Sequence, residues 1–127
     1  AKVWPWAGHR EAPLHTVPTA GPDGTSLYVA TAGSRFHAID ASSGATRWSG
    51  RTDGRVAGSA AVAPDGRYVY FFTEDRGTFR KVDAVSGALV YRSSDGTSVE
   101  GGAVLNRDGT VLYRVDLFGR VVALHTE

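Results

Sequence analysis

Residues 22–48 of the chain read PDGTSLYVATAGSRFHAIDASSGATRW, and residues 64–91 read PDGRYVYFFTEDRGTFRKVDAVSGALVY. A third copy, RDGTVLYRVDLFGRVVALHTE, fills residues 107–127. The aspartate of the Asp-Gly pair recurs after 42 and then 43 residues, at Asp23, Asp65 and Asp108. A sequence that repeats with such a period is built from stacked copies of one structural unit.

Each copy is made of short segments rich in Val, Tyr, Phe and Leu, separated by Asp-Gly or Ser-Gly pairs. Such pairs supply the positive φ angles of tight hairpin turns, so the segments are predicted to be antiparallel strands. The small apolar segments 56–63 and 99–105 precede two of the Asp-Gly pairs and suit an inner strand near a crowded axis. Four strands in about 40–45 residues is the blade of a β-propeller, and we predict an all-β chain of about three such blades.

The two ends of the sequence complement each other. The third copy lacks the Ser-Gly turn and the outer strand that follow in the other two. Residues 1–4 (AKVW) match those outer strands, which read ATRW and ALVY. We therefore expect a single partial propeller with an outer strand at 1–8 and blades at about 14–50, 55–93 and 97–127.

Three blades are too few for a closed ring, because typical propellers have four to eight. The ring is then completed by another chain or by sequence outside the one given. We favour a second copy, which makes six blades and leaves no strand edge open; another propeller subunit is the alternative partner. The predicted strand exchange joins the N-terminal strand of one copy to the last strand of the next, through Ala1, Lys2, Val3 and Trp4 against Val121, Val122, Ala123 and Leu124.

The blade motif resembles that of the pyrroloquinoline-quinone (PQQ)-type propellers. It is carried by LYVA at 27–30, the glycine after it, and FHAIDASSGATRW at 36–48. In that family a strand ending Ala-Leu-Asp is followed by a small-residue turn, a glycine and a tryptophan that docks between blades. The match departs at Tyr91, which replaces the tryptophan, and at His125, which replaces the aspartate.

The resemblance implies a propeller but not a quinone enzyme. The quinone enzymes of the family carry a vicinal cysteine pair and a calcium site, and this chain has no cysteine. Fold does not confer function, and many propellers with these blades act as assembly scaffolds. We expect no cofactor, no metal site and no catalytic residue. The leading hypothesis is a non-catalytic scaffold or assembly subunit, with a carbohydrate- or ligand-binding module and a fragment of a PQQ-dependent dehydrogenase as alternatives.

Charge and composition exclude further classes. The formal net charge of the 127 residues is +1, which does not fit a polybasic nucleic-acid binder. The longest apolar runs are only a few residues, too short for a membrane-spanning helix. The sequence begins at Ala1, which fits a cleaved export signal or a trimmed chain. On the first explanation the protein is extracellular or periplasmic.

Two groups of residues stand out as candidates. Repeated positions are expected to be structural: Asp40 and Asp83 in Asx-type turns, and Trp48 and Tyr91 in packing between blades. The segment 5–18 has no counterpart of the same length in the other copies, and function is often carried on such loops. It supplies the possible ligand contacts Trp6, His9, Arg10 and His15, although packing over a blade seam is the competing interpretation for Trp6.

Overall fold

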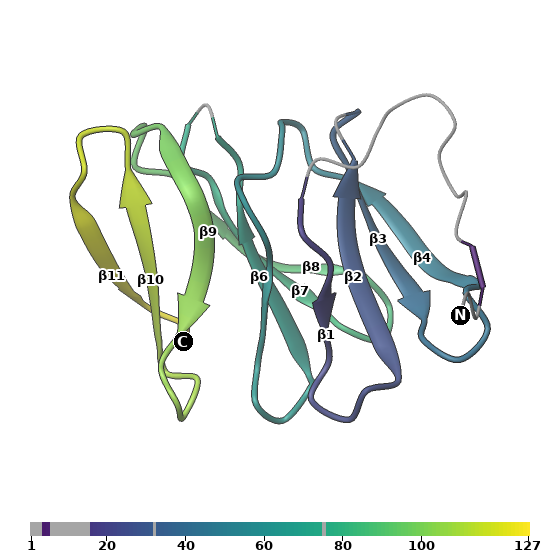
Figure 1. Cartoon of the computed structure of the whole chain (residues 1–127). Helices are drawn as coiled ribbons and strands as arrows, with labels where there is room; N and C mark the ends of the chain where they lie inside the picture. Colours follow the sequence, from purple (N-terminus) through teal and green to yellow (C-terminus); the bar gives the residue numbers. More distant parts are fainter. Residues whose placement is uncertain (1–3, 6–15, 32, 75) are drawn as a thin grey trace.

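The computed structural model describes residues 4–5, 16–31, 33–74 and 76–127. In these residues the secondary structure is all strand, in three antiparallel sheets that follow one another across the molecule (Figure 1). This confirms the predicted all-β fold. Blade one contains β1 (Thr19–Ala20), β2 (Ser26–Thr31), β3 (Arg35–Asp40) and β4 (Thr46–Arg51). Blade two contains β5 (Ala61–Val62), β6 (Tyr68–Phe72), β7 (Phe79–Asp83) and β8 (Leu89–Ser93), and blade three contains β9 (Val99–Leu105), β10 (Val111–Asp116) and β11 (Val121–His125).

The Asp-Gly turns connect the first two strands of every blade in the same way. The glycines have positive φ, a conformation that is strained for residues with a Cβ: 74° at Gly24, 75° at Gly66 and 77° at Gly109. The aspartate before each glycine accepts a hydrogen bond from the backbone N–H two residues further on. This repeated chemistry gives the three blades a common register.

The inner strand of blade two is shorter than the sequence predicts. The expected strand at 56–63 is reduced to β5, with an isolated bridge between Val56 and Thr73. Gly58 interrupts it with a φ of +56°, and a Cβ there would lie 2.3 Å from the backbone nitrogen of Gly102. Close approach of two blades near the axis therefore takes the place of a longer strand.

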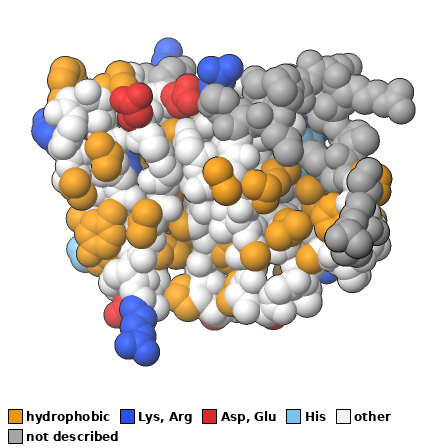
Figure 2. Space-filling model, in the orientation of Figure 1, with side chains coloured by type: hydrophobic (Ala, Val, Ile, Leu, Met, Phe, Trp, Pro, Cys, Tyr) orange, Lys and Arg blue, Asp and Glu red, His pale blue; other side chains and the backbone are white. Residues whose placement is uncertain are grey.

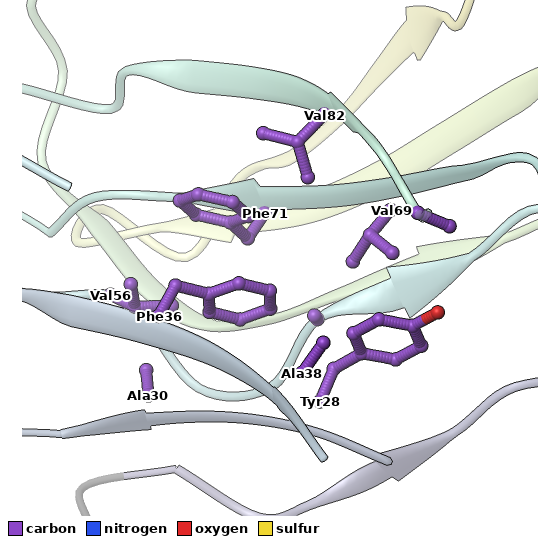
Figure 3. Close-up of a cluster of buried hydrophobic side chains, with 10 residues drawn as sticks. Tyr28, Ala30, Phe36, Ala38, Val56, Val69, Phe71 and Val82 are labelled. Carbon is purple, nitrogen blue, oxygen red and sulfur yellow. The ribbon is translucent and has the colours of Figure 1, made fainter. Parts of the chain in front are cut away.

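The core lies in the two seams between blades, not inside any blade. The first seam joins Tyr28, Ala30, Phe36 and Ala38 of blade one to side chains of blade two (Figure 3). Its centre is a stacked pair, Phe36 and Phe71, with ring centroids 4.5 Å apart. The second seam packs Tyr70, Phe72 and Phe79 of blade two against blade three.

Consecutive aromatic residues on β6 serve both seams. Side chains alternate between the two faces of a strand, so adjacent Phe71 and Phe72 were expected to point in opposite directions and both be covered. The structure confirms this: Phe71 belongs to the first seam, Phe72 to the second, and both are fully buried. Blade two is therefore the central blade of the described array.

We predict that Phe71→Ala lowers the free energy of unfolding by about 3–5 kcal/mol, as for other buried aromatic residues. The matched control is Phe118→Ala, because Phe118 is 80% exposed in a turn of blade three. That change should stay within about 0.5 kcal/mol of the parent. Urea denaturation followed by tryptophan fluorescence measures both, and equal losses would show that the seam is not the core.

Candidate functional site: the two ends of the blade array

A tryptophan on the outer strand of one blade closes the turn of the next. Trp48 of β4 donates a hydrogen bond from Nε1 to the carbonyl oxygen of Ala84, at 2.9 Å. Its indole covers Gly87, where a Cβ would lie 2.6 Å from the ring. Trp48 is half-buried and also packs against the first seam. Gly87 must therefore be a glycine for two reasons: its φ of +76° and the ring above it.

Trp4 makes the same contact one blade earlier. Its Nε1 donates to the carbonyl oxygen of Ala41 at 2.9 Å, and its ring lies over Gly44, with a Cβ there 2.6 Å away. Ala41 and Gly44 occupy in blade one the positions of Ala84 and Gly87 in blade two. Trp4 thus sits where the outer strand of a blade preceding blade one would place it.

Tyr91 occupies in blade two the position of Trp48, where packing between blades is also expected. Its side chain is 55% exposed, and its ring lies 6.0 Å from that of Phe79 in its own blade. Among the described residues no turn glycine lies under Tyr91 in the way that Gly87 lies under Trp48.

Asp40 and Asp83 lie in the turns that these aromatic side chains cover. Oδ1 of Asp40 accepts from the Ser42 hydroxyl and from the backbone N–H groups of Ser42 and Ser43. The Ser42 hydroxyl and the Arg47 guanidinium hold the pKa of Asp40 far below its usual range. Asp83 accepts from the N–H groups of Ser86 and Val85, and these bonds lower its pKa as well. In both residues Oδ1 accepts from the turn that follows it, which is the geometry of an Asx turn, and Oδ2 of Asp40 accepts from Arg47 on β4.

Blade three presents a free apolar face. The positions that face the next blade hold Tyr28 and Phe36 in blade one and Tyr70 and Phe79 in blade two, all buried. In blade three the same positions hold Tyr113 and Val121, which are exposed. With Val104 and Val115 they form one surface, because Tyr113 pairs with Val104 and Val115 with Val121 across the strands. Figure 2 shows hydrophobic side chains gathered at this end of the molecule.

The edge of blade three is also open. Among the described residues β11 pairs only with β10, so Val121, Val122, Ala123 and Leu124 present their other side to solvent. In Figure 1, β11 and the short purple segment of residues 4–5 lie at opposite ends of the array. Of the predicted exchange residues, Ala1, Lys2 and Val3 lie outside the described residues, as do the candidate ligand contacts Trp6, His9, Arg10 and His15.

Two buried arginines that sequence reasoning missed cross the seams. Arg80 donates to Asp53, and Arg114 donates to Asp95 and lies over the ring of Phe72. Asp53 and Asp95 each stand before a glycine in the segment that joins two blades, and these Asp-Gly pairs were the signal in the sequence. The sequence did not indicate which aspartate each arginine would bind, because the two ion pairs depend on how neighbouring blades are placed.

The seams also carry two similar cavities on the side of the Asp-Gly turns. Each has a volume of about 250 Å³; one is lined by Tyr28, Asp23 and Arg47, the other by Tyr70 and Lys81. Burial raises the pKa of both tyrosine hydroxyl groups. Because the cavities recur at both seams, they belong to the blade-to-blade packing. In the described part of the chain, no group of three His, Cys, Asp or Glu side chains could hold a metal ion, and no helix could span a membrane.

Comparison with known proteins places these features in a family. The model described as outer membrane protein assembly factor BamB matches residues 1–127, which confirms the resemblance to PQQ-type propellers. BamB from Moraxella catarrhalis is similar in structure, with a TM-score of 0.78, 23% identity, and coverage of 95% of this chain and 36% of that one. Hydrazine synthase from Kuenenia stuttgartiensis also gives 0.78, at 19% identity, covering 94% and 36%. The chain thus spans about a third of each; a search of curated proteins gives no match.

We predict that Gly87→Ala destabilises the protein by about 1–3 kcal/mol more than Gly96→Ala, the range typical of overpacking. Both glycines have φ near +77°, so both changes carry the same backbone strain. Only Gly87 lies under an indole, whereas a Cβ at Gly96 meets nothing within 4 Å. Thermal unfolding of the two variants measures the difference, and identical melting would show that the Trp48 contact adds no constraint.

Proposed function

Because the chain belongs to the BamB family of PQQ-type propellers, we propose that it is a non-catalytic scaffold module whose ring is completed by strand exchange between two copies. The N-terminal strand of each copy becomes the fourth strand of blade three in the other. Two three-bladed chains then form one six-bladed ring. An isologous pair satisfies both ends at once, because the same two surfaces meet at each joint.

The position of Trp4 is the observation that carries this proposal. Trp4 caps the turn of blade one with the hydrogen bond and ring contact that Trp48 makes on blade two. Trp48 does so as part of the outer strand of the preceding blade. By the same geometry, Trp4 belongs to the outer strand of a blade that precedes blade one. We propose that this preceding blade is blade three of the second copy, which has three strands among the described residues.

The apolar face of blade three supports the same joint. Its valines and tyrosine are exposed, whereas the residues at the equivalent positions of blades one and two are buried against the next blade. We expect a neighbouring blade to cover such a surface. In the proposed ring this surface, together with the open edge of β11, is covered by the partner chain.

The assembly role is proposed from the family. The matching model is named for an assembly factor of outer membrane proteins, and we propose that this chain likewise binds protein partners outside the cytoplasm, in a periplasmic or extracellular setting.

Light scattering tests the joint. We predict a mass twice that of the 13.5 kDa chain. Val121→Glu should weaken association about ten- to a hundredfold, because burying one valine contributes roughly 1.5–3 kcal/mol. Deletion of residues 1–4 should abolish the closed pair and expose the edge of β11 to aggregation.

The matched control is Val85→Glu, since Val85 is 86% exposed but lies in a turn of blade two, at neither end of the array. It should leave the mass of the pair unchanged. A stable monomer of the parent chain at all concentrations would overturn the two-copy ring, as would a deleted chain that keeps the parent's mass and solubility.

A further inference from the structure

The outer strand of blade two has an open edge of unusual composition. Within the described ranges β8 pairs only with β7, so the backbone N–H and C=O groups on its other side have no strand partner. Leu89 and Val90 are 50% and 51% exposed on this strand. Unpaired edges that carry apolar residues are ready-made templates for another strand.

Blade one shows that the fold does not require this composition. Thr46 and Arg47 of β4 occupy the positions of Leu89 and Val90, in the same register and beside the same bulge. Both are exposed even though the blade that follows them, blade two, has all four strands. The exposure of Leu89 and Val90 is therefore a property of the outer rim and does not result from the missing fourth strand of blade three.

Val90 also lacks the structural role of its counterpart. Arg47 donates from Nη1 to the Ser26 hydroxyl at 2.6 Å and from Nη2 to Asp40 at 2.9 Å, which ties the outer strand to the turns of its own blade. A valine makes neither bond. At this position blade two has an apolar surface where blade one has a tether.

β8 also carries an exposed positive charge. Arg92 is exposed and forms no ion pair with any described residue. Its cross-strand neighbour is Arg80, whose charge is taken up by Asp53. Like charges directly opposite each other are destabilising, so a carboxylate brought alongside Arg92 would be complementary to this edge.

We infer that β8 is a binding site for an extended segment of a partner protein, which adds to blade two as a fifth strand. The unpaired backbone of β8 supplies the main-chain hydrogen bonds, Leu89 and Val90 contact apolar side chains of the segment, and Arg92 pairs with a carboxylate on it. Strand addition of this kind takes its affinity from the backbone and its specificity from alternate side chains. The inference goes beyond ring closure and does not depend on it.

Peptide binding tests the site. The probe is a fluorescently labelled, acetylated ten-residue peptide of alternating valine and threonine with one glutamate, titrated with the full chain and followed by anisotropy. We expect saturable binding that is at least tenfold weaker for Val90→Arg. That variant should fold, because it restores the arrangement that Arg47 has in blade one, with Asp83 in the place of Asp40. Leu89→Thr, likewise the blade-one residue, should weaken binding in the same direction.

A charge exchange gives a readout that a merely structural role would not move. Arg92→Glu should weaken binding of the glutamate peptide and strengthen binding of the same peptide with lysine in that place. A peptide with proline at its centre should not bind, because proline cannot complete the strand ladder.

Three results would overturn the inference. Unchanged binding by Val90→Arg would place the peptide elsewhere, and loss of binding in Val121→Glu but not in Val90→Arg would place it on β11. A change of mass for Val90→Arg in light scattering would assign β8 to contact between copies. If the two-copy ring proves wrong, the β8 inference still stands, since β8 and the face of blade three lie on different blades.

Discussion

Every blade of this chain is apolar on both faces, and that constraint governs the rest of the structure. A four-stranded sheet with one apolar face can cover that face with a single neighbour, but β6 carries Phe71 toward blade one and Phe72 toward blade three. Burial of both rings requires a blade on each side. The hydrophobic effect thus acts between blades, and a blade by itself has no interior. Stability in such an array depends on contacts between nearest neighbours.

The ends of the array follow from the same constraint. Blade two has its two neighbours within the chain; blade three has one, and its second face is left with exposed Tyr113 and Val121. The polar devices are arranged around the same contacts. Trp48 closes the turn of the next blade, and Arg80 and Arg114 reach across the seams to Asp53 and Asp95. Both kinds of contact add directional polar bonds to the apolar packing between neighbouring blades.

Much of this architecture could be predicted from the sequence because the blade motif occurs in three copies. Asp-Gly pairs at a constant period place the turns, and alternation on β6 places Phe71 and Phe72 on opposite faces. Features that depend on how two blades approach each other could not be predicted. The break at Gly58 arises from the nearness of Gly102. Tyr91 is exposed where Trp48 is half-buried, and no described turn glycine lies beneath its ring. For the segment that holds Trp6 and His9, the repeat offers no second copy against which an interpretation can be checked.

Differences among the copies carry the information about function that their similarities cannot. Where the fold needs a residue, equivalent positions agree, as Asp40 and Asp83 do in their turns. Where equivalent positions hold different residues, the contacts of each residue show whether its own seam explains the difference. Phe71 and Arg114 occupy equivalent positions, yet each is accounted for by its seam: the first stacks on Phe36, the second pairs with Asp95. Arg47 and Val90 differ in another way: the arginine bonds to Ser26 and Asp40, whereas the valine lies on a strand edge that is open within the described residues. A substitution that gives up a tether and exposes apolar surface is unfavourable for an isolated blade. Its presence at the outer rim of the central blade is explained when that rim is a surface on which another chain lies.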